Sequence, residues 1–114
     1  MQRVRFKFNH WYPKLVGMGA VTSYPYILIA DSTADADIEL LRHEMIHVEQ
    51  IRKMGTAAFY FNYLKQMVTG FVRTGDFNTA YLKNEFEAEA YSRQTEPFSE
   101  AEKVELIRAG VKFT

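Results

Sequence analysis

His43, Glu44 and His47 are the residues of this sequence whose types and spacing point most directly to chemistry. On a helix, residues four apart project from one face about one turn apart, so both imidazole rings can reach a single metal ion. Zinc in catalytic sites takes three protein ligands and a water molecule, and a neighbouring glutamate can accept a proton from that water. The pattern His-Glu-x-x-His therefore predicts a zinc site suited to hydrolysis, with the two histidines as ligands and Glu44 as general base.

A third ligand has to come from elsewhere in the chain, and it must be nitrogen or oxygen because there is no cysteine. The candidates are His10 and the glutamates at 85, 87 and 89. Alternate residues of a helix point about 200° apart, so Glu85 and Glu87 cannot share a face. Glu87 is favoured because Ala90, on the same face, lets this helix approach the first one closely. Glu85, Glu89 and His10 remain open, as does simple solvation of all three glutamates.

The elements that must hold these residues are a small sheet and a long helix. Three short runs have the alternation or the composition of strands: residues 2–8, 16–22 and 26–30. The period then changes to that of a helix over residues 34–54, with capping residues at 31–33 and a stop at Gly55. We expect an α+β fold in which an antiparallel sheet of about three strands packs on the active-site helix.

Three further helices are predicted downstream, over residues 56–68, 78–93 and 99–109. Ser99 and Glu102 match a capping box at the start of the last helix, and Gly110 marks its end. The segment 56–72 is apolar, but polar residues interrupt it and it is shorter than the roughly 20 residues that a membrane span needs. We expect a buried helix there, with an interfacial or partner-binding helix as the alternative.

The composition, 47% hydrophobic and 25% charged, is that of an ordinary globular chain, and 114 residues suit one compact domain over residues 1–114. Lys plus Arg equal Asp plus Glu at 14 each, with no long run of one sign, so a nucleic-acid partner is not expected. The absence of cysteine and of a signal-peptide stretch at the N-terminus fits a cytoplasmic protein.

Two motifs of the chain resemble those of the gluzincin metallopeptidases. His43-Glu44-Met45-Ile46-His47 is followed well downstream by Glu87-Ala88-Glu89-Ala90, which is similar to the helical Glu-x-x-Ala of that family. The small size resembles the minimal single-domain members, the minigluzincins. The similarity extends over roughly residues 15–92 to small prokaryotic and phage proteins of this type. It runs through residues 41–50, 54–55, 59–64 and 84–90.

The resemblance implies a zinc metalloendopeptidase in which a sheet lies over the active-site helix and a later glutamate helix completes the site. Carried over residue by residue, His43, His47 and Glu87 are zinc ligands. Glu44 is the general base that activates the bound water and later protonates the leaving amine. The strand 26–30 would be the edge against which a peptide or an unfolded protein substrate pairs.

Parts of the family pattern are missing or ambiguous. Many gluzincins have an acid after the Ala of Glu-x-x-Ala that orients a ligand histidine, whereas here Tyr91 follows Ala90. In the competing register Glu89 follows Ala88, which keeps Glu85 open and leaves the partner of the histidines unassigned. The hydrogen-bond donor for an oxyanion is one of three tyrosines: Tyr60, Tyr63 and Tyr91.

Two interpretations other than an active peptidase remain open. In the first, the chain is a latent or inactive zinc-binding relative of a peptidase. In the second, it is a metal-stabilised interaction module. A closed structural site would not need Glu44, so this glutamate favours hydrolysis. Small members of the family inhibit themselves, which implies that residues 92–114 or self-association could block the cleft here.

Overall fold

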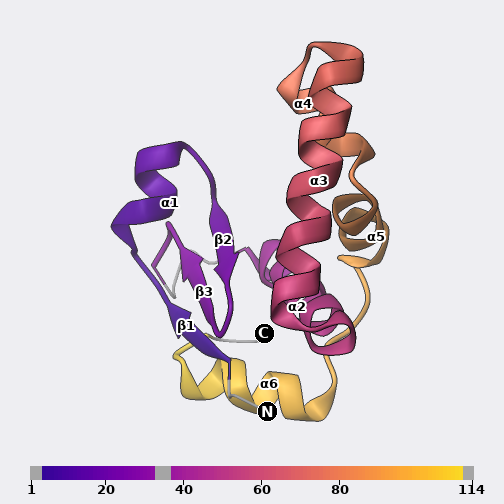
Figure 1. The fold of residues 1–114 in the computed structure, drawn as a ribbon. Helices are drawn as coiled ribbons and strands as arrows, with labels where there is room; N and C mark the ends of the chain where they lie inside the picture. The colour runs from indigo at the N-terminus through magenta and orange to yellow at the C-terminus, as the bar shows by residue number, and fades with distance from the viewer. Residues whose placement is uncertain (1–3, 33–36, 112–114) are drawn as a thin grey trace.

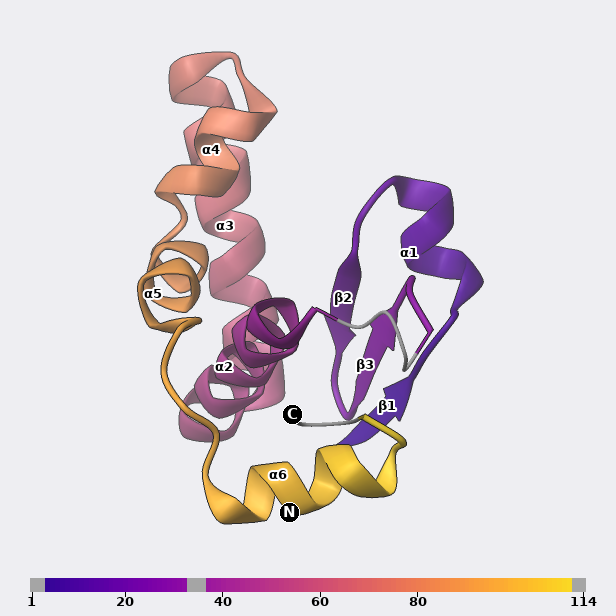
Figure 2. The ribbon, with the colours of Figure 1, turned by 180° about the vertical axis from the view of Figure 1, so that it is seen from behind.

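The computed structural model describes residues 4–32 and 37–111, which form three strands and six helices. They are β1 (Arg5–Lys7), α1 (Trp11–Val16), β2 (Ala20–Ser23), β3 (Tyr26–Ile29), α2 (Ile38–Met54), α3 (Thr56–Thr74), α4 (Phe77–Lys83), α5 (Glu85–Arg93) and α6 (Glu100–Arg108). The fold is α+β, as predicted. The sheet lies on one side of α2 and helices α3 to α5 lie on the other (Figures 1 and 2).

The sheet is mixed, so the prediction of an antiparallel sheet is wrong in this respect. Its strand order is β1-β3-β2. Ala20 of β2 lies opposite Ile29 in an antiparallel pair, whereas Arg5 of β1 lies opposite Tyr26 in a parallel pair. Only two residues connect β2 to β3, and so short a connection requires antiparallel pairing. Strands β1 and β3 are separated in the chain by α1 and β2, and this longer connection allows them to pair in parallel.

The short helix α1 was not predicted, and it displaces the start of the second strand. Nδ1 of His10 accepts a hydrogen bond of 3.1 Å from the backbone N–H of Tyr12 and so caps the helix. Gly17 ends the helix in the left-handed region, with φ of 73°. Because Val16 belongs to this helix, the strand expected from residue 16 begins only at Ala20.

The central helix, α2, begins after Asp37, whose side chain accepts hydrogen bonds from the backbone N–H groups of Glu39 and Leu40. The predicted first turn at 34–36 lies outside the described residues. On the side that faces the sheet, α2 contributes Leu41 and Val48 to the main apolar core. The core consists of Ala20, Ile27, Ile29, Leu41, Val48, Phe98, Leu106 and Val111. This packing holds α2 firmly against β2 and β3.

Helix α3 is longer and more exposed than predicted. It continues to residue 74, and only Phe59 and Met67 are buried. Helix α4 packs back against it closely, since a Cβ on Gly70 would lie 2.9 Å from Cβ of Ala80. The expectation of a buried helix over residues 56–72 is therefore wrong. Among the described residues, no helix combines the length and apolar character needed to cross a membrane.

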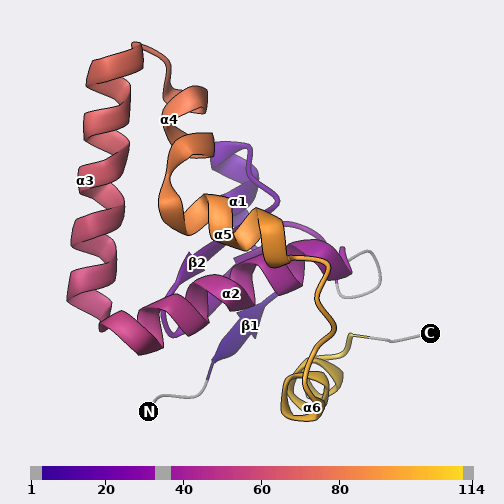
Figure 3. The same cartoon turned by 90° about the vertical axis from the view of Figure 1, so that its right-hand side faces the viewer.

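The helix predicted over residues 78–93 is broken at Asn84, which ends α4 and begins α5. Asn84 is extended (φ −61°, ψ 128°), and its side chain accepts hydrogen bonds from the backbone N–H groups of Phe86 and Glu87. Asparagine is a preferred N-cap because its oxygen satisfies these otherwise unpaired donors. The break turns α5 so that it lies along α2 (Figure 3) and puts Glu87 in the first turn of α5.

Helix α6 begins at the predicted capping box. Ser99 and Glu102 exchange hydrogen bonds between their side chains and backbone N–H groups. The buried Arg42 of α2 is bound to this region, with one guanidinium nitrogen 3.2 Å from Glu102 and another 3.1 Å from Glu96. These contacts fasten the C-terminal segment to α2.

Candidate metal centre

Helices α2 and α5 bring His43, His47 and Glu87 together in a buried group that can hold a metal ion. One ligand atom from each residue lies within 4.8 Å of the other two. Nε2 of His43 is 2.9 Å and Nε2 of His47 is 3.1 Å from the same oxygen, Oε1 of Glu87. The four-residue spacing of the histidines and the break before α5 together produce this convergence.

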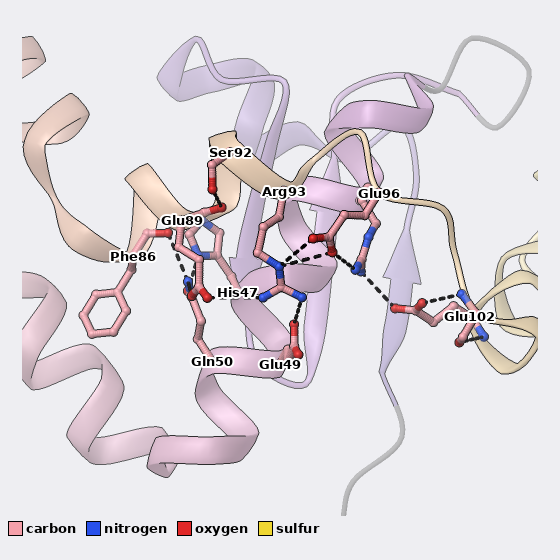
Figure 4. A network of polar contacts seen from close by, with 11 residues as sticks. His47, Glu49, Gln50, Phe86, Glu89, Ser92, Arg93, Glu96 and Glu102 are labelled. Carbon is pink, nitrogen blue, oxygen red and sulfur yellow. Dashed lines mark hydrogen bonds and ion pairs between the residues drawn. The ribbon is translucent and has the colours of Figure 1, made fainter.

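Glutamine side chains hold the other nitrogen of each histidine ring. Oε1 of Gln50 is 2.8 Å from Nδ1 of His47, and Oε1 of Gln94 is 3.0 Å from Nδ1 of His43. The Gln50 amide can face only one way, because its Nε2 donates to a backbone carbonyl of α5 and to Oε1 of Glu89 (Figure 4). In the neutral rings the protons are therefore on Nδ1, and each Nε2 presents its lone pair.

This set of donors fits a divalent cation. With the protons on Nδ1, the two Nε2 lone pairs and the Glu87 carboxylate oxygen converge without a proton between them. A cation relieves the resulting repulsion, and two imidazoles with one carboxylate are ligands that zinc takes in open catalytic sites. The glutamines fix the tautomer and the orientation of the rings, as partners of metal-binding histidines do.

Glu87 is held in its charged form. Burial alone raises the pKa of Glu87, but the hydrogen bonds that this carboxylate accepts from His43 and His47 when Nε2 of each ring carries a proton outweigh burial and hold that pKa below its usual range. Its second oxygen, Oε2, accepts a hydrogen bond of 2.5 Å from the Tyr63 hydroxyl. Burial and the charge of Glu87 both raise the pKa of Tyr63, so this phenol stays protonated and remains a donor.

Glu44 lies beside the group in a different environment. It is buried, and its Oε2 accepts a hydrogen bond of 2.7 Å from Oγ1 of Thr22 on β2. Burial raises the pKa of Glu44, although the charge of His47 and the Thr22 hydrogen bond oppose the shift. The pKa values of the two carboxyl groups are thus shifted in opposite directions: Glu87 favours the charged form, and Glu44 takes up a proton more readily. Such a division suits one ligand and one proton acceptor.

The site lies in a cleft between β2 and the hairpin of α3 and α4. Two adjoining cavities of about 590 and 430 Å³ form the cleft, and Glu44 lines both. The other residues that line both are apolar or aromatic: Met18, Ala20, Val21, Phe77 and Tyr81. Of the described residues that line the two cavities, only Glu44 and Glu87 are acidic, and none is lysine or arginine. Apart from the site itself, the cleft is therefore uncharged and mostly apolar.

The other candidate ligands lie outside this group. Glu85 is exposed and forms hydrogen bonds with Gln66 on α3. Glu89 binds the glutamine that orients His47, so an acid acts on this histidine through an intervening amide. His10 caps α1 instead of approaching the site.

The three tyrosines considered as oxyanion donors have distinct positions. Tyr63 donates to Glu87, and the ring of Tyr91 lies edge-on to His43 with centroids 4.5 Å apart. The Tyr60 hydroxyl donates to the carbonyl of Thr22 and accepts from the backbone N–H of Tyr24, both at 3.1 Å. Tyr60 therefore bridges α3 and β2.

Strand β2 borders the cleft, so the expectation that residues 26–30 form the substrate-facing edge is wrong. Strand β3 is paired on both sides and lies in the middle of the sheet. The backbone N–H of Ala30 donates to the carbonyl of Gly19 at 2.9 Å, and antiparallel alternation then turns the backbone groups of Thr22 away from β3. The Thr22 carbonyl accordingly meets Tyr60. The sheet edge at the cleft is β2, partly covered by Tyr60.

The C-terminal segment packs elsewhere. Leu106 of α6 joins the main core, and α6 borders a separate hollow with Val4 and Phe6. Of the described residues after Arg93, Gln94 approaches the site, and none through Val111 lines the two cavities of the cleft. The expected covering of the cleft by residues 92–114 is therefore not seen through residue 111, and residues 112–114 lie outside the described part.

Gln50 and Gln94 are the site residues that sequence reasoning missed. Gln50 follows His47 by three residues, a spacing that places two side chains on one helix face, so a local signal existed. Gln94 follows the last residue of α5 and has no periodic relation to His43. Its contact depends on how α5 lies along α2.

The geometry defines a class of site. It is a buried group of two histidines and one carboxylate in an apolar cleft, with a separate glutamate beside it. No protein-family model, curated protein or solved structure matches the chain.

Proposed function

We propose that this chain is a zinc-dependent hydrolase, a metallopeptidase that acts on peptides or unfolded proteins. The convergence of His43, His47 and Glu87 beside Glu44 in the cleft is the observation that carries this proposal. A bound zinc ion would act as a Lewis acid and lower the pKa of a water molecule. His43 and His47 would hold this ion through Nε2 and Glu87 through Oε1.

The remaining polar residues of the site have roles in positioning and proton transfer. Glu44 takes the proton of the attacking water and later gives it to the leaving amine. Thr22 holds Glu44 in position from β2 through its hydroxyl. Gln50 and Gln94 keep the Nε2 lone pairs directed at the metal position.

The cleft suits an extended substrate with uncharged, apolar side chains, because its walls are apolar and its acids belong to the site. Such a segment would lie along β2, where backbone groups point away from β3. Tyr60 has to release the Thr22 carbonyl for full pairing. We place the activity in the cytoplasm, because a chain without cysteine suits a reducing compartment.

A second candidate function is a latent zinc protein or a metal-stabilised interaction module. The burial of the site favours it: His43, His47 and Glu87 are only 4–5% exposed. The Tyr60 bridge across the edge of β2 favours it as well. In this case zinc would bind and stabilise the fold without turnover.

Cleavage of a reduced, unfolded protein by the zinc-loaded chain separates these functions. Wild type is compared with Glu44→Gln. Glu49→Gln on the same helix is the matched control, because Glu49 pairs with Arg93 outside the cleft. We expect cleavage by wild type and Glu49→Gln, and its loss in Glu44→Gln with zinc retained. Zinc binding without cleavage by wild type would support the latent protein, and unchanged cleavage by Glu44→Gln would refute the mechanism.

A further inference from the structure

The outer face of α3 is apolar along most of its length. Phe61 and Val72 are 70% and 77% exposed, and Leu64, Val68 and Phe71 are exposed as well. At 3.6 residues per turn, these five side chains fall within an arc of about 100°. A helix on a globular protein ordinarily turns such a stripe inward, so an exposed stripe of this size marks an interaction surface.

A second group of exposed apolar residues lies on α1, whose Tyr12 and Val16 line the cleft. Trp11 and Leu15 of this helix are 66% and 74% exposed. Figures 1 and 2 show α1 and the α3–α4 hairpin rising on the same side of α2. Phe77 of α4 is also exposed and lines both cavities. We call these exposed residues together the rim face: Trp11, Leu15, Phe61, Leu64, Val68, Phe71, Val72 and Phe77.

The charges around the rim face are mostly of one sign. Helices α1 and α3 carry Lys14, Lys65 and Arg73 and contain no acid. Across residues 56–83, Asp76 is the only acid against three cations, whereas residues 84–111 hold seven glutamates and three cations. A chain with no net charge thus combines a cationic, apolar rim with acidic helices elsewhere.

We propose that the rim face binds the surface of an anionic phospholipid bilayer. Its aromatic and aliphatic side chains enter the headgroup region, and Lys14 and Lys65, which flank the apolar residues of α1 and α3, meet the lipid phosphates. A second copy of the chain fits less well, because a symmetric contact would bring one cationic rim face against another. Leu64 and Phe77 of the rim face also line the cavities of the cleft, so the rim face borders the site. This proposal does not depend on hydrolysis.

Vesicles of phosphatidylcholine, prepared with and without phosphatidylglycerol, test the proposal directly. We expect the protein to sediment with the phosphatidylglycerol vesicles and to stay in solution with the neutral ones. Added salt should weaken the binding. Trp11 is the only tryptophan, so entry of α1 into the headgroup region shifts the protein's emission to shorter wavelength without a label.

Paired variants assign this binding to the rim face. We expect Phe61→Ser with Val68→Ser, and separately Lys14→Glu with Lys65→Glu, each to lower vesicle affinity by about tenfold or more. Val104→Ser with Ile107→Ser is the matched control, because it removes two exposed apolar side chains from α6. Circular dichroism confirms that each variant is folded.

Three results would overturn the proposal. The first is a folded protein that does not bind phosphatidylglycerol vesicles. The second is an α6 control that loses as much vesicle affinity as the rim variants. Alternatively, sedimentation equilibrium could show a dimer that Phe61→Ser dissociates, without any vesicle binding, which would assign the face to a second copy.

Discussion

Oε1 of Gln50 lies 2.8 Å from Nδ1 of His47, three residues earlier on α2. The same amide donates from Nε2 to Glu89 at 2.7 Å, so Gln50 connects a ligand histidine to an acid of α5. This chain of contacts fixes which nitrogen of His47 faces Glu87. The group that orients this histidine is therefore an amide, which is itself held by an acid.

Replacing Gln50 should weaken metal binding without removing a ligand. We expect Gln50→Leu to lower zinc affinity about 10- to 100-fold, because His47 loses the acceptor that fixes its tautomer. Competition with a chromophoric chelator measures this affinity. Gln66→Leu is the control, since Gln66 binds Glu85 outside the site. Equal affinities for the two variants would contradict the role given to Gln50.

Asn84 should matter both for stability and for the site. Asn84→Ala removes the cap of α5 and is expected to lower the free energy of unfolding of the metal-free protein by about 1–2 kcal/mol. Zinc affinity should fall as well, because Glu87 lies in the first turn of α5. Denaturant unfolding measures the first effect. Asn84→Ser keeps an accepting oxygen at the cap without burying a charge beside the Tyr63 carbonyl and should be milder. A loss as large as that of the alanine variant would argue against capping.

The metal-free protein should lose stability as pH rises. Burial lowers the pKa of His47, but its hydrogen bond with Glu87 and the charge of that residue outweigh burial and raise the pKa above 6.5. Protonated His47 thus contributes stability that is fully present below pH 6.5 and is lost as pH rises through the raised pKa. Burial also raises the pKa of Glu44, which adds to the loss.

Thermal unfolding of chelated and zinc-loaded protein between about pH 6 and 9 measures this dependence. We expect Tm of the metal-free protein to fall over this range. Stabilisation by zinc should increase over it, because zinc binds the neutral imidazole. Glu87→Gln removes the charge that raises the His47 pKa and should flatten the metal-free profile. A metal-free Tm that rises with pH would refute the assigned pairing.

Tyr60 should restrain the entry of an extended substrate. Tyr60→Phe frees the Thr22 carbonyl and the Tyr24 N–H, so KM for an apolar peptide should fall about two- to tenfold while kcat changes little. Steady-state kinetics measures the split between the two constants. Tyr12→Phe, which changes another tyrosine that lines the cleft, serves as control. An increase in KM would instead make the Tyr60 hydroxyl a substrate contact.

The parts of the site that follow local rules could be predicted from the sequence. The pairing of His43 with His47 depends only on helix spacing, and Glu87 was selected by the face it shares with Ala90. The structure brings these three side chains together. The α+β class also followed from the change of period after the last strand.

The parts that depend on distant contacts could not be predicted. Asn84 fits the interior of a helix by pattern, and only the packing of α5 along α2 shows that it is a cap. The parallel pairing of β1 joins segments about 20 residues apart in sequence, which no local periodicity encodes. Apolar composition predicted burial of α3, yet Phe61 and Val72 face outward. A helix is buried only where another part of the fold packs over it, and the composition of α3 does not show whether such a partner exists.

Metal content is the measurement that tests the central claim most directly. Protein purified without added metal would be analysed as wild type, Glu87→Ala and Glu85→Ala, the last being a matched glutamate on the same helix. The account predicts about one equivalent of zinc in wild type and Glu85→Ala, and its loss in Glu87→Ala. Wild-type protein without metal, or Glu87→Ala protein that keeps its zinc, would contradict a site built from His43, His47 and Glu87.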